Sequence, residues 1–355
     1  VAGTRSPAEN SEDLRSTLFA LQLRSLADSS QRTYRSSSQQ WCQYRRSRQL
    51  PIWLPRNDPD EQSLQLTLFA VQCWRTSGIG FATIQSKLSH VGWYHCIKYG
   101  TRPKLNDGHH LALRGLRRTA SASRPRAPVS QQLLVAFSNL VDFGNPQHRV
   151  LFGATVLGFY FLLRRSEYLI CDGRRYPYCL EVRDVKVADG EGRTTLNYQA
   201  AASVQIQFRG SKNDQYRQGT ARMLQKASRP PICPVFGAIW LMKNAADLDL
   251  SPEKPLCSLS NSWMVSAKMM NAALQLAAQH VGHDQRLYTT HSLRIRGATA
   301  LFHGGAEPTA IEYHGRWRSE AYRRYTRNPE QRTRRLTQLM ASELTMSTAT
   351  TSSDH

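Results

Sequence analysis

His291 and Arg294 are three residues apart in the stretch Thr290-His291-Ser292-Leu293-Arg294. Residues three apart lie on one face of a helix, so this imidazole and this guanidinium can both reach a single anionic group. The planar guanidinium also matches the oxygen geometry of a phosphate. An isolated histidine is more often a structural residue of a core, but its spacing from an arginine favours a phosphate clamp.

A second group of candidate residues follows in Gly315-Arg316-Trp317 and in two tyrosines, Tyr322 and Tyr325. A tyrosine hydroxyl can act as a nucleophile. An indole can donate an N–H hydrogen bond or pack against the site. The two tyrosines are three residues apart, so both could approach a phosphate held by the clamp. Both tyrosines are therefore candidates for the nucleophile.

Other charged candidates lie upstream. A buried helix expected over residues 149–168 carries Arg164-Arg165-Ser166-Glu167 near its end, where an arginine ordinarily interacts with the helix dipole. Farther along, Lys212 is the sole lysine between Lys186 and Lys226. It lies in the predicted turn of a β-hairpin. A lysine ammonium can lose its proton when partly desolvated, so Lys212 is a candidate acid, although a solvated turn lysine is the simpler interpretation.

Together these motifs resemble the catalytic C-terminus of the tyrosine recombinases, the phage-integrase superfamily. The ordered pattern is His-x-x-Arg, a Gly-Ala step, a Gly-x-Trp and a tyrosine. Gly-Ser-Lys-x-Asp-Gln at the hairpin, and a spacing of eight residues from Trp317 to Tyr325, resemble the eukaryotic Crypton and DIRS-type mobile elements. The resemblance implies a catalytic set of Arg164, Lys212, His291, Arg294, Trp317 and Tyr325. It makes Glu167 a supporting acid, with Arg165 as the alternative to Arg164. Tyr322 follows Trp317 by only five residues, too few for the loop of this family, and is interpreted as a packing residue.

This resemblance implies a DNA strand-transferase that recombines or integrates DNA through a 3′-phosphotyrosyl intermediate, with no metal, ATP or other cofactor. It also implies double-stranded DNA as partner, a homotetramer on two duplexes, and a nuclear location if the source is eukaryotic, otherwise the cytoplasm or nucleoid. Two alternatives remain. One is an enzyme like the type IB topoisomerases, and the other is a host-retained DNA-binding protein without catalysis.

The charge of the chain points to the same kind of partner. The formal net charge is +21, the pI is near 10.1, and arginine outnumbers lysine by 38 to 9. Such a balance suits a polyanion, although arginine-rich codon usage could also produce it. The arginines expected to contact DNA are Arg32, Arg35, Arg114, Arg117, Arg118, Arg209, Arg316 and Arg324.

The pattern of apolar residues predicts a mainly α fold with a small antiparallel β-sheet, the α+β class. Val182 and Val185 are expected in one strand, residues 204–208 in the next, and residues 217–224 pairing back. Combined with the resemblance to the tyrosine recombinases, this pattern implies a disordered segment 1–10, a helical, SAM-like core-binding domain 11–118, a linker 119–130, a catalytic domain 131–332 and a C-terminal helix and tail 333–355.

Two further classes are disfavoured by the sequence. Seven cysteines without Cys-x-x-Cys spacing argue against a disulfide scaffold or zinc ribbon and favour a reducing compartment. The longest apolar run, residues 150–163, is shorter than the ~20 residues that span a membrane. In the C-terminal tail, an apolar stripe at helical spacing predicts packing in trans on another subunit; its members are Leu336, Leu339, Met340 and Leu344.

Overall fold

The computed structural model describes residues 7–119, 126–211, 214, 218–228 and 230–325. Contacts divide the chain into two compact units, residues 1–123 and 124–355, and the division falls within the segment predicted as a linker. The predicted C-terminal helix and its stripe of Leu336, Leu339, Met340 and Leu344 lie outside the described residues. None of the described helices is both long enough and apolar enough to cross a membrane.

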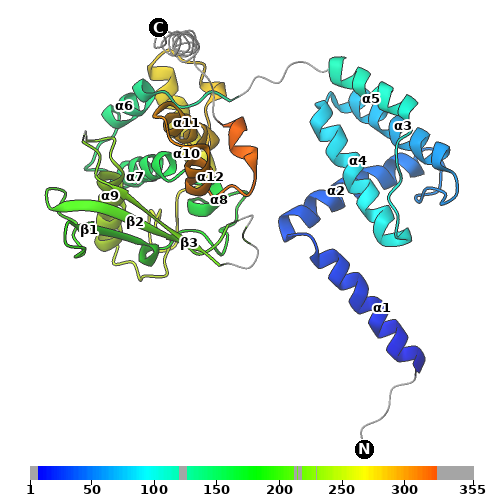
Figure 1. Cartoon of the computed structure of the whole chain (residues 1–355), viewed down its shortest axis with the longest axis horizontal. Helices are drawn as coiled ribbons and strands as arrows, with labels where there is room; N and C mark the ends of the chain where they lie inside the picture. The colour runs from blue at the N-terminus through cyan, green and yellow to red at the C-terminus, as the bar shows by residue number, and fades with distance from the viewer. Residues whose placement is uncertain (1–6, 120–125, 212–213, 215–217, 229, 326–355) are drawn as a thin grey trace, which may run out of the picture. The chain divides into compact units, whose positions relative to one another are not determined.

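Every described secondary-structure element of the first unit is a helix, as the sequence predicted. Its core contains Trp41, Phe69, Ile84 and Val91, each at most 2% exposed. The Trp41 ring meets Phe69 edge to face at 5.2 Å. His95 is also buried and accepts the Leu54 N–H at 3.2 Å, so it is a structural residue. The helices are α1 Pro7–Arg24, α2 Asp28–Arg46, α3 Pro59–Ser77, α4 Phe81–Tyr99 and α5 Asp107–Thr119 (Figure 1).

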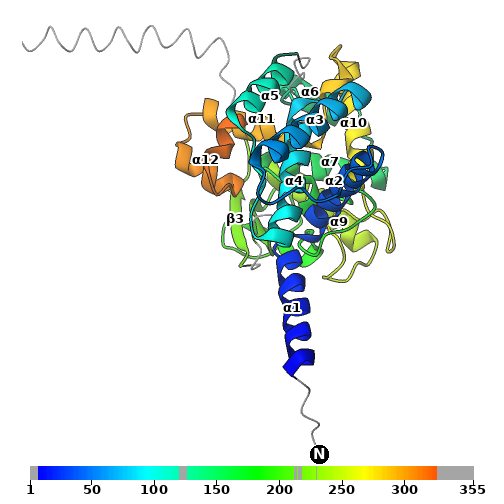
Figure 2. The ribbon, with the colours of Figure 1, turned by 90° about the vertical axis from the view of Figure 1, so that its right-hand side faces the viewer.

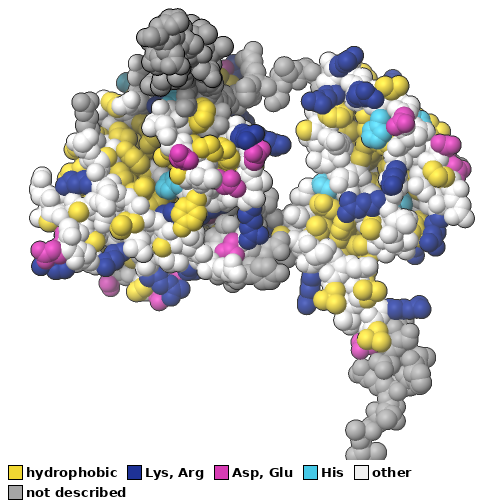
Figure 3. Space-filling model, viewed as in Figure 1, with side chains coloured by type: hydrophobic (Ala, Val, Ile, Leu, Met, Phe, Trp, Pro, Cys, Tyr) yellow, Lys and Arg dark blue, Asp and Glu magenta, His cyan; other side chains and the backbone are white. Residues whose placement is uncertain are grey.

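Helix α1 begins at Pro7, inside the segment predicted to be disordered. Its apolar positions Leu14, Leu18 and Leu21 are 64%, 56% and 58% exposed, because α1 extends away from the other helices of its unit (Figures 2 and 3).

The second unit combines helices with one antiparallel sheet of order β1-β2-β3. Helices α7 and α9 pack closely together, and α9 also contacts all three strands (Figure 1). This confirms the predicted α+β class. The elements up to the sheet are α6 Gln131–Asn139, α7 Pro146–Tyr160, α8 Arg165–Tyr168, η1 Val182–Asp184, β1 Val185–Asp189, β2 Ala201–Phe208 and β3 Thr220–Gln225. Those that follow are α9 Pro234–Asp247, α10 Ala267–His280, η2 Gln285–Leu287, α11 Thr290–His303, α12 Pro308–Gly315 and η3 Glu320–Arg324.

The central strand β2 shows the alternation that the sequence predicted. Val204, Ile206 and Phe208 are buried, and the residues between them are exposed. The flanking strands begin later than expected. Val182 lies in the 3-10 turn η1 and not in a strand, and β3 begins at Thr220.

The buried helix predicted over residues 149–168 is interrupted. Helix α7 ends at Tyr160, Leu162 takes a left-handed conformation with φ of 50°, and a new short helix begins after Arg164. Gly297 of α11 lies against this turn. A Cβ there would come within 2.2 Å of the Leu162 side chain and 2.4 Å of the Phe159 carbonyl oxygen. Only glycine therefore lets α11 approach the end of α7 this closely.

The end of the predicted linker belongs to the second unit. Val129 is fully buried, and its N–H donates to the Ser292 carbonyl at 3.4 Å. Ala127 donates to the Leu287 carbonyl at 3.1 Å. The segment predicted as a connector up to residue 130 is thus, from Ala127, tied to the chain around α11.

Candidate active site

Helix α11 positions the His291 and Arg294 pair. Thr289 and Ser292 form a capping box at its first turn, which fixes where the helix begins. Arg294 is only 2% exposed. Its guanidinium donates to the carbonyls of Leu162 and Gly315 and stacks on the Trp317 ring with 4.1 Å between guanidinium carbon and ring centroid. Two segments distant in sequence, the turn at Leu162 and the segment 315–317, therefore hold one guanidinium in a single orientation.

Arg164, Glu167 and Arg316 form a buried ionic network beside Arg294. Glu167 is fully buried and accepts from the Arg164 guanidinium at 2.8 Å and from Arg316 at 2.7 Å. It also accepts the Arg164 backbone N–H at 2.8 Å. Arg164 donates in turn to the Arg316 carbonyl at 2.9 Å. The acid therefore orients two arginines from opposite ends of the domain sequence.

The structure separates Arg164 from its neighbour Arg165. Arg164 is the N-cap residue of α8, with its side chain 18% exposed and paired to Glu167. The Arg165 side chain is 57% exposed and pairs with the surface carboxylate of Asp172, at 3.7 Å. Arg164 is thus the one that joins the cluster.

Tyr325 lies against the same cluster in the same chain. Its ring is 5.2 Å from His291 and 5.2 Å from Trp317, and the Arg294 guanidinium lies 5.9 Å from its centroid. The Thr299 hydroxyl donates to the Tyr325 carbonyl at 2.7 Å, which ties the residue to α11.

The other tyrosine, Tyr322, has the position of a packing residue. It is 7% exposed and contributes to a small apolar cluster with Leu162, Ala298 and Ile311. Its ring centroid lies 6.4 Å from that of Trp317. The structure therefore presents Tyr325 to the charged cluster and buries Tyr322 beneath Trp317 and α11.

Gly315 explains how Trp317 reaches Arg294. A Cβ at Gly315 would lie 1.6 Å from the Trp317 ring, so any other residue would displace the indole. Arg316 between them has a φ of 57°, the left-handed conformation that ends α12. The Gly-Arg-Trp sequence thus folds the indole back over the glycine and onto Arg294.

The charges of the site are strongly coupled. Burial by itself would raise the pKa of Glu167, but Arg316, Arg164 and Arg294 together lower it below the usual range. Burial and then repulsion from Arg164 and Arg316 lower the pKa of Arg294. Three guanidiniums facing one carboxylate leave the cluster with excess positive charge, which favours an anion.

His291 is kept in its neutral form by the same surroundings. Desolvation, followed by repulsion from Arg294, Arg165 and Arg126, lowers the pKa of His291. A neutral imidazole at neutral pH can accept a proton. No group of three His, Cys, Asp or Glu side chains among the described residues is arranged to hold a metal ion.

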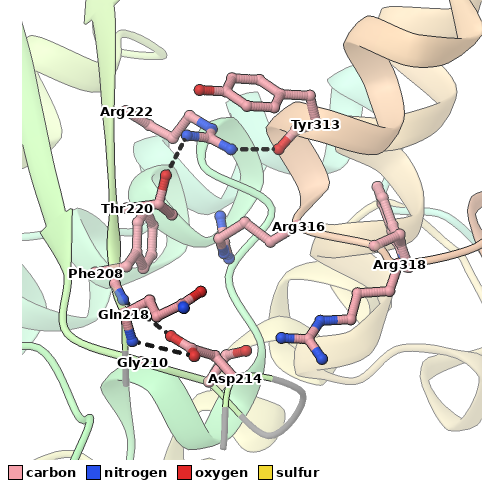
Figure 4. Close-up of a pocket in the computed structure, with 12 residues that line it drawn as sticks. Phe208, Gly210, Asp214, Gln218, Thr220, Arg222, Tyr313, Arg316 and Arg318 are labelled. Atoms are coloured by element: carbon pink, nitrogen blue, oxygen red, sulfur yellow. Dashed lines mark hydrogen bonds between the residues drawn. The ribbon is translucent and has the colours of Figure 1, made fainter. Parts of the chain in front are cut away.

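Lys212 lies outside the described residues, but the chain on both sides of it is described. Ser211 and Asp214 line a pocket of about 230 Å³ together with Arg316 and Trp317 (Figure 4). The β2–β3 connection therefore approaches the cluster from the side of Trp317.

The arginines predicted to contact DNA fall into two groups. Six have exposed side chains, which leaves them available to a partner; they are Arg32, Arg35, Arg114, Arg117, Arg118 and Arg324. Arg209 and Arg316 do not fit this expectation. Arg209 pairs with Asp184 at 2.9 Å and Glu181 at 3.1 Å. Arg316 is 7% exposed, bonded to Glu167 and stacked on Phe208 at 3.8 Å. Acidic partners close in space, but distant in sequence, hold both inside the unit.

The burial of two arginines that lie beside the site was not predicted from the sequence. Arg316 was placed on the DNA surface and belongs to the buried network instead. Arg222 was not considered. It lies in β3 and is buried, which is unusual for an arginine. Its burial depends on the register of β3, which pairs it with Ile206 and which the sequence alone does not give.

A scan against protein-family models and a search of curated proteins gave no match. Solved structures do match. One is a Tn1549 transposon integrase in complex with transposon right end DNA, with a TM-score of 0.57 and 13% identity, covering 92% of this chain and 99% of that one. Another is the XerH site-specific recombinase bound to a palindromic difH substrate in a post-cleavage complex. Its TM-score is 0.53 and its identity 15%, and the match covers 79% of this chain and 70% of that one. The chain therefore has the fold of these integrases and recombinases.

Proposed function

We propose that this protein is a site-specific DNA recombinase or integrase that cleaves and rejoins strands through a covalent 3′-phosphotyrosyl intermediate. The observation that carries the proposal is the convergence of Tyr325 with His291 and Arg294 beside the Arg164–Glu167–Arg316 network. The test is formation of a denaturation-resistant protein–DNA adduct on a nicked duplex taken from the ends of the encoding element.

In the proposed reaction the Tyr325 oxygen forms a bond to phosphorus while the bond from phosphorus to the 5′ oxygen breaks. Neutral His291 is positioned to help accept the tyrosine proton, and Lys212 would return a proton to the leaving 5′ oxygen. The new phosphotyrosyl ester is close in energy to the phosphodiester that was broken. A 5′-hydroxyl from another strand can therefore reverse the step without ATP.

Arg164 and Arg294 would carry the electrostatic part of this reaction. The phosphate gains negative charge on its non-bridging oxygens as the fifth bond forms, and preorganised guanidiniums stabilise that charge. Glu167 and the carbonyls of Leu162 and Gly315 fix both side chains before substrate arrives.

The partner in this proposal is double-stranded DNA, with four subunits on two duplexes. Its support is the basic surface, the exposed arginines and the resemblance in motif. A topoisomerase-like enzyme would use similar groups. The His-x-x-Arg spacing favours a recombinase, because many topoisomerases carry a lysine where this chain has His291. A silent DNA-binding protein would have no need to keep Tyr325 beside His291 and Arg294.

We expect Arg164→Ala to slow adduct formation by about 10²–10³-fold, because it removes one donor from a preorganised site. Arg165→Ala is the matched control, since it deletes the same side chain one residue away at an exposed position. Its rate is expected to stay within a few-fold of the wild type. Equal losses in the two variants would contradict the assignment of Arg164 to the phosphate.

DNA affinity is expected to fall by about 10³–10⁵ between ~50 and ~200 mM salt, because several arginine–phosphate contacts release condensed counterions. The measurement is fluorescence anisotropy of a labelled duplex over a salt series. Replacing Arg114, Arg117 and Arg118 together by glutamine should make the salt dependence shallower. An affinity that does not change with salt would contradict the proposal that the positive charge of the protein drives DNA binding.

A further inference from the structure

The pocket between the β2–β3 connection and α12 is a second site next to the charged cluster. It has a volume of about 230 Å³, and Arg316 and Trp317 form the wall that it shares with the cluster. Figure 4 shows Arg222 and Tyr313 at one end, and Asp214 and Gln218 at the other. None of His291, Arg294 or Tyr325 lines it, so the proposed phosphodiester chemistry leaves its purpose open.

Arg222 gives this pocket a buried positive charge. The residue is 8% exposed, and its guanidinium donates to the Thr220 hydroxyl at 2.7 Å, the Ala221 carbonyl at 2.7 Å and the Tyr313 carbonyl at 2.6 Å. All these partners are neutral, and no carboxylate of the described residues pairs with it. Burying a guanidinium without an acid is costly, so an anion near the pocket would be stabilised.

Tyr313 supplies a flat apolar surface at the same end. The Arg222 guanidinium carbon lies 3.7 Å from its ring centroid, so one face of the ring is covered by a cation. The residue is nevertheless 68% exposed, which leaves the opposite face open. An aromatic ring held rigidly by a buried arginine, with one face free, is a stacking platform for a planar group.

The remaining lining is suited to a phosphate. Arg318 is exposed at the edge of the pocket, and Arg316 lies on its inner wall. Asp214 is the acidic member of the described lining, and its carboxylate already accepts the backbone N–H groups of Gln218 at 3.2 Å and Gly219 at 3.0 Å. The balance of charge in the lining is therefore positive.

We propose that the edge of this pocket at Tyr313 binds one unpaired nucleotide of the DNA strand that carries the freed 5′-hydroxyl. Its base stacks on the open face of Tyr313, and its phosphate binds Arg318. Arg222 is a positioning residue that holds the ring. The identity of the strand rests on the proposed function: Ser211 and Asp214 line this pocket, and they flank in sequence the lysine proposed to protonate the 5′ oxygen. Such a site would hold the melted end before it is rejoined.

The test compares two labelled probes at fixed salt: a nicked duplex with a short unpaired 5′-hydroxyl flap, and the same nicked duplex fully paired. Because stacking of one base on an aromatic ring is worth a factor of about ten or more, wild-type protein should bind the flap about tenfold more tightly. Tyr313→Ala should bring the ratio close to one, and Tyr313→Phe should preserve it. Trp263→Ala, at a 56% exposed aromatic outside the pocket, is the matched control and should also preserve it.

A flap with an abasic first nucleotide completes the experiment. It should remove the preference of the wild type and change nothing further in Tyr313→Ala, because the base and the ring are two halves of one contact. This arm needs no folded variant. A wild type without flap preference, or a preference that survives either Tyr313→Ala or the abasic flap, would overturn the inference. Adduct formation is scored separately, so loss of the adduct with the preference intact rejects only the proposed function.

Discussion

Replacing Glu167 with glutamine is expected to lower the free energy of unfolding by about 3–5 kcal/mol, the usual cost of removing one partner from a buried ionic network. Glutamine keeps the volume and can still accept hydrogen bonds, so the change isolates the charge. Three arginines would then face one another without a counterion: Arg164, Arg294 and Arg316. The measurement is chemical denaturation followed by circular dichroism.

The pH dependence of stability provides an independent check on the same residue. The arginines lower the pKa of Glu167 in the folded protein relative to its value of about 4.3 in the unfolded chain. A lowered folded pKa gives stability that is fully present above the unfolded pKa and is lost as pH falls through the folded pKa. Wild-type protein should therefore lose stability below about pH 5 more steeply than Glu167→Gln does.

Glu191→Gln is the matched control for both measurements. Glu191 pairs with Arg193 at 2.8 Å, but both side chains are 71% exposed, and exposed pairs contribute little. This variant should unfold close to the wild type. If it loses as much stability as Glu167→Gln, burial of the network is not what makes Glu167 important.

Much of the site could be predicted from the sequence because its motifs are local. Each motif is short: His291 and Arg294 share one helical turn, and Gly315 directly precedes Arg316. Tyr325 follows Trp317 within one loop. The buried alternation of β2 was equally visible. Each of these features depends on side chains that are close in sequence, and helix or strand periodicity alone determines their common face.

The parts that could not be predicted depend on contacts between distant segments. The apolar residues 150–163 predict a helix that continues through Arg164. In the structure a left-handed turn at Leu162 ends it, and Gly297 of α11 packs against that turn. Arg316 resembled a surface arginine because its partner Glu167 lies far away in the sequence. A tertiary turn and a tertiary ion pair leave no periodic signal.

Tyr325→Phe is expected to abolish the covalent protein–DNA adduct altogether, because phenylalanine fills the same space without the attacking oxygen. Fold and DNA affinity should be retained. The ring contacts with His291 and Trp317, both at 5.2 Å, do not require the hydroxyl, and the bond to Thr299 uses the backbone. Circular dichroism and anisotropy binding check these two properties.

Tyr322→Phe is the matched control, since it makes the same change three residues away. Tyr322 is 7% exposed and packed in an apolar cluster, so its variant should still form the adduct. A reduced yield from Tyr322→Phe, with Tyr325→Phe fully inactive, would mean that the Tyr322 hydroxyl helps to place Trp317.

The most direct measurement is a peptide map of the adduct formed by wild-type protein on a nicked suicide duplex. The nucleotide-bearing peptide is expected to contain Tyr325 as the modified residue, and no adduct is expected to form with Tyr325→Phe. A modified Tyr322, or an adduct that persists in Tyr325→Phe, would contradict this expectation.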